Sequence, residues 1–127
     1  MIELLSPPGS PVPRGPYSPA VRAGDFLFIS GQGPLDRESN QLSFGDIRHE
    51  TRLVLSNIRF ILEGCGASMS DVVKVTVYLA DAKDFAAMNE VYAEMFEGHR
   101  PARTTVEAQF VAPPMKVEID VIAYKPK

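Results

Sequence analysis

Two segments of the chain alternate between apolar and other residues and predict strands with one buried face. In both 72–79 and 117–124 every second residue is apolar, which matches the side-chain period of a strand. Residues 26–30 form a short apolar run between glycines and predict a buried strand, and 103–108 predicts a further strand before the last one. The alternation assigns to the core Val73, Val75, Val77, Leu79, Val117, Ile119, Val121 and Ala123.

Apolar residues recur at helical spacing in two other segments. Asp46 is a good N-cap for a helix that runs to about Glu63 and stops at the glycines that follow. A second helix begins near Asp81 or Asp84 and ends before Gly98. Its apolar side is expected to pack in the core and consists of Phe85, Met88, Tyr92, Met95 and Phe96.

The order strand, helix, strand, helix, strand, strand predicts an α+β fold. It is a two-layer sandwich in which both helices cover one face of a single sheet. The other face keeps Val72, Tyr78 and Ile122 among polar residues. Such a half-apolar face is either an interface between subunits or an ordinary solvated face of an antiparallel sheet, and the pattern alone favours neither.

Prolines set the first part of the chain apart. Six of the 11 prolines lie between residues 7 and 19, and each of them removes a backbone donor. This stretch is therefore not expected to form a helix or a central strand. We predict a single domain over 1–127 in which residues 1–19 form an extended arm lying over the body, although proline content alone fits a floppy terminus equally well.

Composition and charge exclude several classes of function. The 127 residues carry a formal net charge of −3 and no run of like charges, which argues against nucleic-acid and membrane partners. No apolar stretch approaches the ~20 residues of a transmembrane helix, and the start lacks the features of a signal peptide, so we expect a cytoplasmic protein. With Cys65 as the single cysteine and two distant histidines, the sequence predicts neither a disulfide nor a metal site.

Three polar residues are candidates for chemistry. Arg103 opens a strand after a proline, and its guanidinium fork suits a carboxylate ligand. Glu118 lies within an otherwise apolar strand, where a carboxylate often has a raised pKa and acts as a general base. Tyr17 offers an aromatic wall and a hydroxyl. Each also has an ordinary explanation: a salt bridge, the polar face of an amphipathic strand, and a surface anchor for the arm.

These residues occur in motifs that, read together, resemble a known family. Over about residues 6–124 the chain is similar, in order and with few gaps, to the Rid (YjgF-type) reactive-intermediate deaminases. The motifs that carry the resemblance are GPYSPAV (15–21), ISGQGPLD (29–36), GDIRHETRLVLSNIRFILEGCGAS (45–68), VVKVTVYLADAKDFAAMNEVYAEMF (72–96), RPART (100–104) and VEIDVIAY (117–124).

The resemblance implies a fold, an assembly and an activity. The fold is the chorismate-mutase-like sandwich, with one mixed sheet and two helices on one of its faces. The assembly is a homotrimer around a central barrel, with ligand sites in the clefts between subunits. The activity is hydrolysis of enamine or imine intermediates, typically 2-aminoacrylate, to 2-keto acids and ammonia, without a cofactor.

The resemblance also assigns roles to residues of this sequence. The family's carboxylate-binding arginine corresponds to Arg103, its water-handling glutamate to Glu118 and its pocket tyrosine to Tyr17. These three are the expected catalytic residues. Thr105 stands where many members have a cysteine whose backbone N–H contributes to ligand binding. The expected substrate-binding residues are Ser30, Gly31, Asn89 and Thr105.

Some positions depart from the family pattern, and other functions stay open. Gly33, Pro19 and the segment 110–116 differ from many members near the mouth of the expected pocket, so they bear on substrate breadth. A non-catalytic trimer that senses 2-keto acids is one alternative, and a pathway-specific deaminase acting on a substrate such as aminomuconate is another. A nuclease or translation-inhibitor role, sometimes ascribed to relatives, is disfavoured by the net charge of −3.

Overall fold

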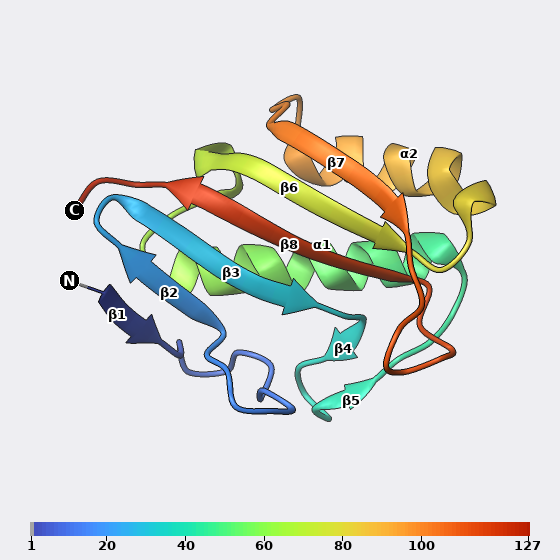
Figure 1. The fold of residues 1–127 in the computed structure, drawn as a ribbon, viewed down its shortest axis with the longest axis horizontal. Coiled ribbons are helices and arrows are strands. Elements are labelled where there is room, and N and C mark those ends of the chain that lie inside the picture. The colour runs from blue at the N-terminus through green and yellow to red at the C-terminus, as the bar shows by residue number, and fades with distance from the viewer. Residues whose placement is uncertain (1) are drawn as a thin grey trace.

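The computed structural model describes residues 2–127. The main elements are β1 (Ile2–Leu5), β2 (Ala20–Ala23), β3 (Phe26–Gln32), α1 (Ile47–Gly64), β6 (Val72–Leu79), α2 (Phe85–Phe96), β7 (Ala102–Glu107) and β8 (Val117–Tyr124). Over this range the chain forms a mixed six-stranded sheet in the order β1-β2-β3-β8-β6-β7, with α1 and α2 on one face (Figure 1). The α+β sandwich predicted from the sequence is confirmed.

The topology places β8 at the centre of the sheet and β7 at one edge. β8 is antiparallel to β3 on one side and to β6 on the other. β6 and β7 are parallel, and the connection between them contains α2, as a parallel pair requires. The helix-facing side chains of β7 therefore lie beside α2.

The core lies between the sheet and the helices, and β8 follows its predicted pattern. Val117, Ile119, Val121 and Ala123 are at most 1% exposed under the helices, whereas Glu118 and the alternate residues lie on the uncovered face.

At the start of β6 the predicted faces were wrong. A register shift between Val72 and Lys74 inserts an extra residue, which reverses the alternation at that point. Val72 is fully buried, and Val73, predicted for the core, is 43% exposed. Of the apolar residues assigned to the uncovered face, Tyr78 and Ile122 remain there.

Both predicted helices form, with one error in α2. The Asp46 carboxylate accepts the His49 N–H at 2.8 Å and caps α1, as predicted. A 3₁₀ turn, η2 (Ala82–Asp84), precedes α2, so the regular helix begins later than Asp81. Phe85 is 45% exposed and is not a core residue, because it lies in the first turn of α2, at the rim of the layer.

Several short elements were not predicted. Ile2–Leu5 pairs with β2 at the edge of the sheet, so the first residues of the arm form a strand, which precedes the prolines. A hairpin of β4 (Leu35–Asp36) and β5 (Gln41–Leu42) follows β3, and η1 (Met69–Asp71) precedes β6. These elements escape periodicity because two to four residues carry too little pattern.

The rest of the arm lies against the body of the domain. The Val12 N–H donates to Asn40 Oδ1 at 3.2 Å, and the Arg14 guanidinium donates to the Asn40 carbonyl at 3.2 Å. Asn40 has a φ of 56°, the left-handed conformation of a tight turn that asparagine tolerates better than most residues. The turn between β4 and β5 thus holds the arm close to the edge of the molecule that carries Glu118.

Candidate active site

Arg103 lies on the helix-facing side of β7. It pairs with the buried Val75 across the parallel ladder, so its side chain points toward α2. Its guanidinium carbon lies 4.7 Å from the centre of the Tyr92 ring and 5.6 Å from that of Phe85. Aromatic faces attract a cation and hold it in place without neutralising it. Within residues 2–127, no ion pair includes Arg103.

A hollow of about 500 Å³ opens beside this guanidinium. Two polar atoms of residues that line it, Asn89 Oδ1 and Tyr92 Oη, are buried and find no hydrogen-bond partner within the described residues. Thr105 Oγ1 is also buried without a partner among these residues, but Thr105 lines a separate hollow. Buried polar atoms normally have partners, so such atoms beside a cation mark a place where a ligand can bind. The residues that line the hollow include Asn89, Tyr92, His99, Arg100, Pro101 and Arg103.

The structure therefore brings Asn89 together with Arg103, and Thr105 follows two residues later on the same side of β7. Tyr92 was predicted only as a core residue. Burial raises the pKa of its hydroxyl, although the nearby Arg103 charge acts in the opposite direction. The sequence signal that could have identified Tyr92 as a site residue is its position on the predicted core side of a helix, because a buried phenol hydroxyl needs a hydrogen-bond partner.

Glu118 lies on the opposite, uncovered face of the sheet. It pairs with Tyr78 of β6, whose side chain also points away from the helices. The Glu118 carboxylate rests against the backbone of Gly31, where β3 has a register shift between Ile29 and Gln32. A Cβ at position 31 would overlap Glu118 Oε2 and lie 3.1 Å from its carboxyl carbon. Gly31 is thus required for the carboxylate to occupy this place.

The surroundings of Glu118 favour its protonated form. Burial raises the pKa of the Glu118 carboxyl, and the negative charge of Asp120 on the same strand face raises it further. Asp120 accepts a hydrogen bond from the Tyr78 hydroxyl at 3.1 Å. A carboxyl group with a raised pKa beside a hollow is a candidate general base.

A second hollow, of about 340 Å³, lies beside Glu118. Ser30 is held nearby, because its hydroxyl donates to the Ser18 carbonyl at 2.6 Å. Tyr17 is 49% exposed, and its hydroxyl accepts the backbone N–H of Arg14 at 3.2 Å. Arg14 lines this hollow, so Tyr17 is connected to the hollow only through Arg14. The hollow is lined in part by Pro11, Arg14, Gln32, Leu35, Met115 and Glu118.

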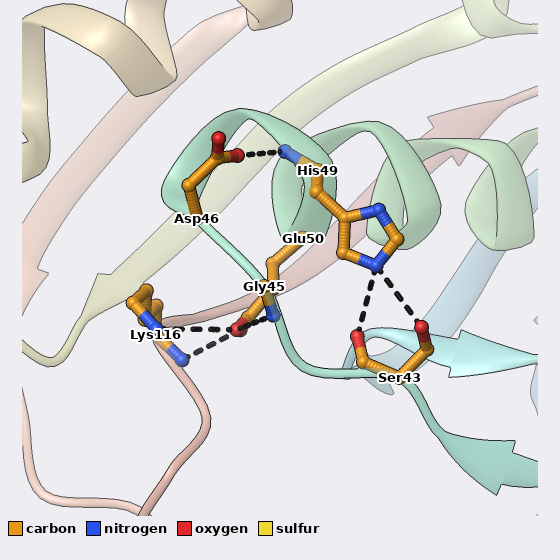
Figure 2. A network of polar contacts seen from close by, with 6 residues as sticks. All are labelled: Ser43, Gly45, Asp46, His49, Glu50 and Lys116. Atoms are coloured by element: carbon orange, nitrogen blue, oxygen red, sulfur yellow. Dashed lines mark hydrogen bonds and ion pairs between the residues drawn. The ribbon is translucent and has the colours of Figure 1, made fainter.

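The strand that carries Glu118 is anchored by a buried carboxylate, Glu50 (Figure 2). Glu50 is fully buried; its Oε1 accepts the Lys116 N–H at 2.7 Å and its Oε2 accepts the Gly45 N–H at 3.1 Å. The Lys116 ammonium lies 3.7 Å from Oε2. Since Lys116 directly precedes β8, this network fixes where β8 begins. This network was not predicted, because in the sequence Glu50 looks like any acidic residue in the first turn of a helix.

The predicted site residues thus form two groups on opposite faces of one sheet. Asn89, Arg103 and Thr105 belong to the helix-facing group. In the other group Gly31 contacts Glu118, Ser30 precedes Gly31 in β3, and Tyr17 is connected only through its hydrogen bond to Arg14. Within residues 2–127, no three His, Cys, Asp or Glu side chains gather as metal ligands. None of the helices in the same range is long and apolar enough to cross a bilayer.

Comparison with known proteins connects this arrangement to a family. The model of the Endoribonuclease L-PSP family matches residues 8–125. A RutC family protein of Pyrococcus horikoshii is 51% identical over 125 residues, 98% of this chain and 99% of that protein. The 3-aminoacrylate deaminase RutC of Acinetobacter baylyi is 39% identical over 122 residues, 96% of this chain and 97% of that protein. The crystal structure of E. coli TdcF with bound serine matches with a TM-score of 0.89 and 32% identity, covering 97% of this chain and 98% of that one.

The chain belongs to the Endoribonuclease L-PSP family, which is the YjgF/Rid family that its motifs resemble. The family includes deaminases, RutC among them.

Proposed function

We propose that the protein hydrolyses enamine and imine intermediates of the 2-aminoacrylate type to 2-keto acids and ammonia, in clefts between the subunits of a homotrimer. Its substrates include 2-iminopropanoate and 2-iminobutanoate. The observation that carries the proposal is Glu118, a half-buried carboxylate with a raised pKa beside an open hollow. No ion pair within residues 2–127 engages it.

The reaction asks little covalent chemistry of the protein. The protonated imine carbon is already electrophilic, so a water oxygen adds to C2 while Glu118 takes a proton from that water, and the C=N electron pair moves to nitrogen. Glu118 then returns that proton to the nitrogen. It next takes the proton of the C2 hydroxyl as C=O forms, and the C–N bond breaks with its electron pair on the departing ammonia. Arg103 holds the substrate carboxylate with its fork. Placement of substrate and water is the main contribution to the rate.

The positions of Arg103 and Glu118 support a cleft between subunits. The two side chains leave opposite faces of the same sheet, so within one chain they do not address a common substrate. If a second copy packs on the uncovered face, its Arg103 can approach the Glu118 hollow from outside. Apolar side chains on that face, such as Phe28 at 42% exposure, are suited to such packing.

The comparisons support the chemistry at the level of the family. The relative from Acinetobacter baylyi is named for a deamination of 3-aminoacrylate, an enamine. A ribonuclease activity, which the family description names, has weaker support, because a net charge of −3 provides no attraction for phosphate.

The test couples a serine or threonine dehydratase to the protein and follows the decay of the released imine. We expect decay faster than in buffer with the parent protein and with Glu63→Gln, an exposed control on α1. A rate equal to the uncatalysed rate would refute the proposed function.

Mixed assemblies test the shared cleft. Arg103→Lys and Glu118→Gln are each expected to be nearly inactive alone. Unfolded together and refolded as random trimers, about a quarter of the clefts combine an intact arginine with an intact glutamate. Activity should therefore return to about a quarter of the parent level. Mixtures that stay inactive, or variants that are monomeric by light scattering, would refute a site shared between subunits.

A second candidate is a sensor that binds 2-keto acids or amino acids without turning them over. The hollow at Arg103, with its unpartnered Asn89 and Tyr92 atoms, favours ligand binding without any part for Glu118. The relative TdcF is known with bound serine. Pyruvate binding by calorimetry together with no imine hydrolysis would support this candidate over the enzyme.

A further inference from the structure

The hollow beside Glu118 has an apolar wall that the reaction itself does not require. Leu35 and Leu42 of the β4–β5 hairpin form one side of this wall. Val111 and Met115, in the loop between β7 and β8, form another side. Leu35 and Met115 are 5% and 7% exposed, so both side chains are packed in place. An apolar wall next to the carboxylate is suited to an apolar part of a ligand.

The depth of the hollow along this apolar wall depends on a contact between Gly33 and Met115. A Cβ at position 33 would lie 2.7 Å from the Met115 sulfur and 3.7 Å from a Leu42 methyl carbon. The Met115 thioether therefore occupies the space that any other residue at position 33 would fill. The backbone of Gly33 does not have a positive φ, so the need for glycine is one of space and not of backbone conformation.

Both sides of the wall are anchored. The Met115 N–H donates to the Ala112 carbonyl at 3.0 Å, and the next residue is tied to the buried Glu50. On the other side, the Asn57 amide donates to the Leu35 carbonyl at 2.8 Å. Since the loop and the hairpin cannot easily move apart, a group added at position 33 must displace the flexible Met115 side chain within the hollow.

We propose that Gly33 and Met115 determine which substrate side chains this site accepts. The proposal rests on the proposed function. With the substrate C2 beside Glu118, the group attached to C3 enters the apolar hollow, whose free length is set by how far Met115 withdraws over Gly33. The site takes imines with extended aliphatic side chains as well as small ones, and the pair controls the ratio between the two.

The experiment compares two imines made in place by an amino-acid oxidase, one from alanine and one from leucine, with semicarbazide as the competing trap. Gly33→Ala pushes Met115 into the hollow. It should lower kcat/KM for the leucine imine by about 10-fold or more relative to the alanine imine, the range typical of one methyl group in a tight apolar pocket. Met115→Ala should raise the same ratio. Gly33→Ala combined with Met115→Ala should restore the leucine imine, because the displaced side chain is gone.

Met69→Ala is the matched control, because Met69 is also 7% exposed but lies outside the hollow, in η1. It should lower stability without changing the ratio. Equal losses for both imines in Gly33→Ala, or no recovery in the double variant, would overturn the proposal.

Failure of the proposed function gives a different result, namely no hydrolysis of the alanine imine by the parent protein. In that case calorimetry with pyruvate and 4-methyl-2-oxopentanoate tests the pair directly. Gly33→Ala is expected to weaken binding of the longer keto acid selectively, and unchanged relative affinities would overturn the assignment.

Discussion

The Arg103 side and the Glu118 side of the sheet are formed by different kinds of structural element and by side chains of different polarity. The hollow at Arg103 is formed by β7, α2 and the turn that joins them, and its polar atoms face a cation held over aromatic rings. The hollow at Glu118 is formed by the arm, the β4–β5 hairpin and the loop before β8, and most of its wall is apolar.

This difference matches what each side has to recognise. Every 2-imino acid has a carboxylate, and in our proposal that invariant group is bound by regular elements, which hold geometry well. The side chain varies between substrates, and it meets loops, which tolerate substitution and insertion. Specificity can therefore change at the Glu118 side without disturbing the Arg103 side. Four predictions test this separation.

Arg103→Lys should have the largest effect. It keeps the positive charge but loses the planar fork, so binding of pyruvate should weaken by ~2–5 kcal/mol. Calorimetry measures the loss, and Arg100→Lys is the matched control, because it makes the same replacement at another arginine that lines the hollow. Unchanged affinity in Arg103→Lys would show that the arginine is structural.

Glu118→Gln should separate turnover from binding. The glutamine keeps the shape and can orient water but cannot accept a proton, so kcat should fall by ~10²-fold while pyruvate affinity stays near the parent value. The dehydratase-coupled assay and calorimetry are run on the same preparation. Parent-level hydrolysis in this variant would remove Glu118 from the mechanism.

Glu50→Gln should damage the Glu118 side selectively. A glutamine has one acceptor oxygen where Glu50 uses two, so the N–H of Gly45 or Lys116 loses its partner. The expected cost is ~1–3 kcal/mol of unfolding free energy in urea, with a larger fall in kcat than in pyruvate affinity. Glu63→Gln, on the same helix but exposed, should change neither. Equal losses in kcat and in pyruvate affinity in Glu50→Gln would contradict the separation of the two sides.

Asp120→Asn should have the smallest effect, seen only in the pH profile. The Asp120 charge raises the pKa of Glu118, so its removal lowers that pKa. Glu118 must be deprotonated to accept a proton, and activity falls as the pH drops through its pKa. The acid limb should therefore move to lower pH, with activity at neutral pH nearly unchanged. Asp120→Glu retains the charge and should leave the acid limb in place. A shift of the acid limb to higher pH in Asp120→Asn would refute the assigned cause.

The regular elements were predictable because their residues carry long patterns. Eight alternating residues in β8 and a capped apolar stripe in α1 leave little choice of structure. The bulge at Val72 was not predictable, because one inserted residue in an apolar run leaves the composition of the strand unchanged.

The site was predictable only in part. Glu118 stands out in the sequence because it lies within an otherwise apolar strand, and Arg103 because it opens a strand after a proline. Their placement on opposite faces follows from the parallel register of β7, which is set by tertiary pairing. Glu50 and the Gly33–Met115 contact join segments far apart in the chain, and such contacts leave no local signal.

The central position of β8 also bears on how the protein is made. β8 is the last strand along the chain, yet it bridges β3 and β6 (Figure 1). During synthesis, the β1–β3 half and the β6–β7 half must wait for it, with the edges of β3 and β6 unpaired in the meantime. Pairings between distant segments form slowly, and exposed strand edges invite aggregation. The same strand delivers Glu118, so a nascent chain gains its reactive carboxylate only when its sheet closes.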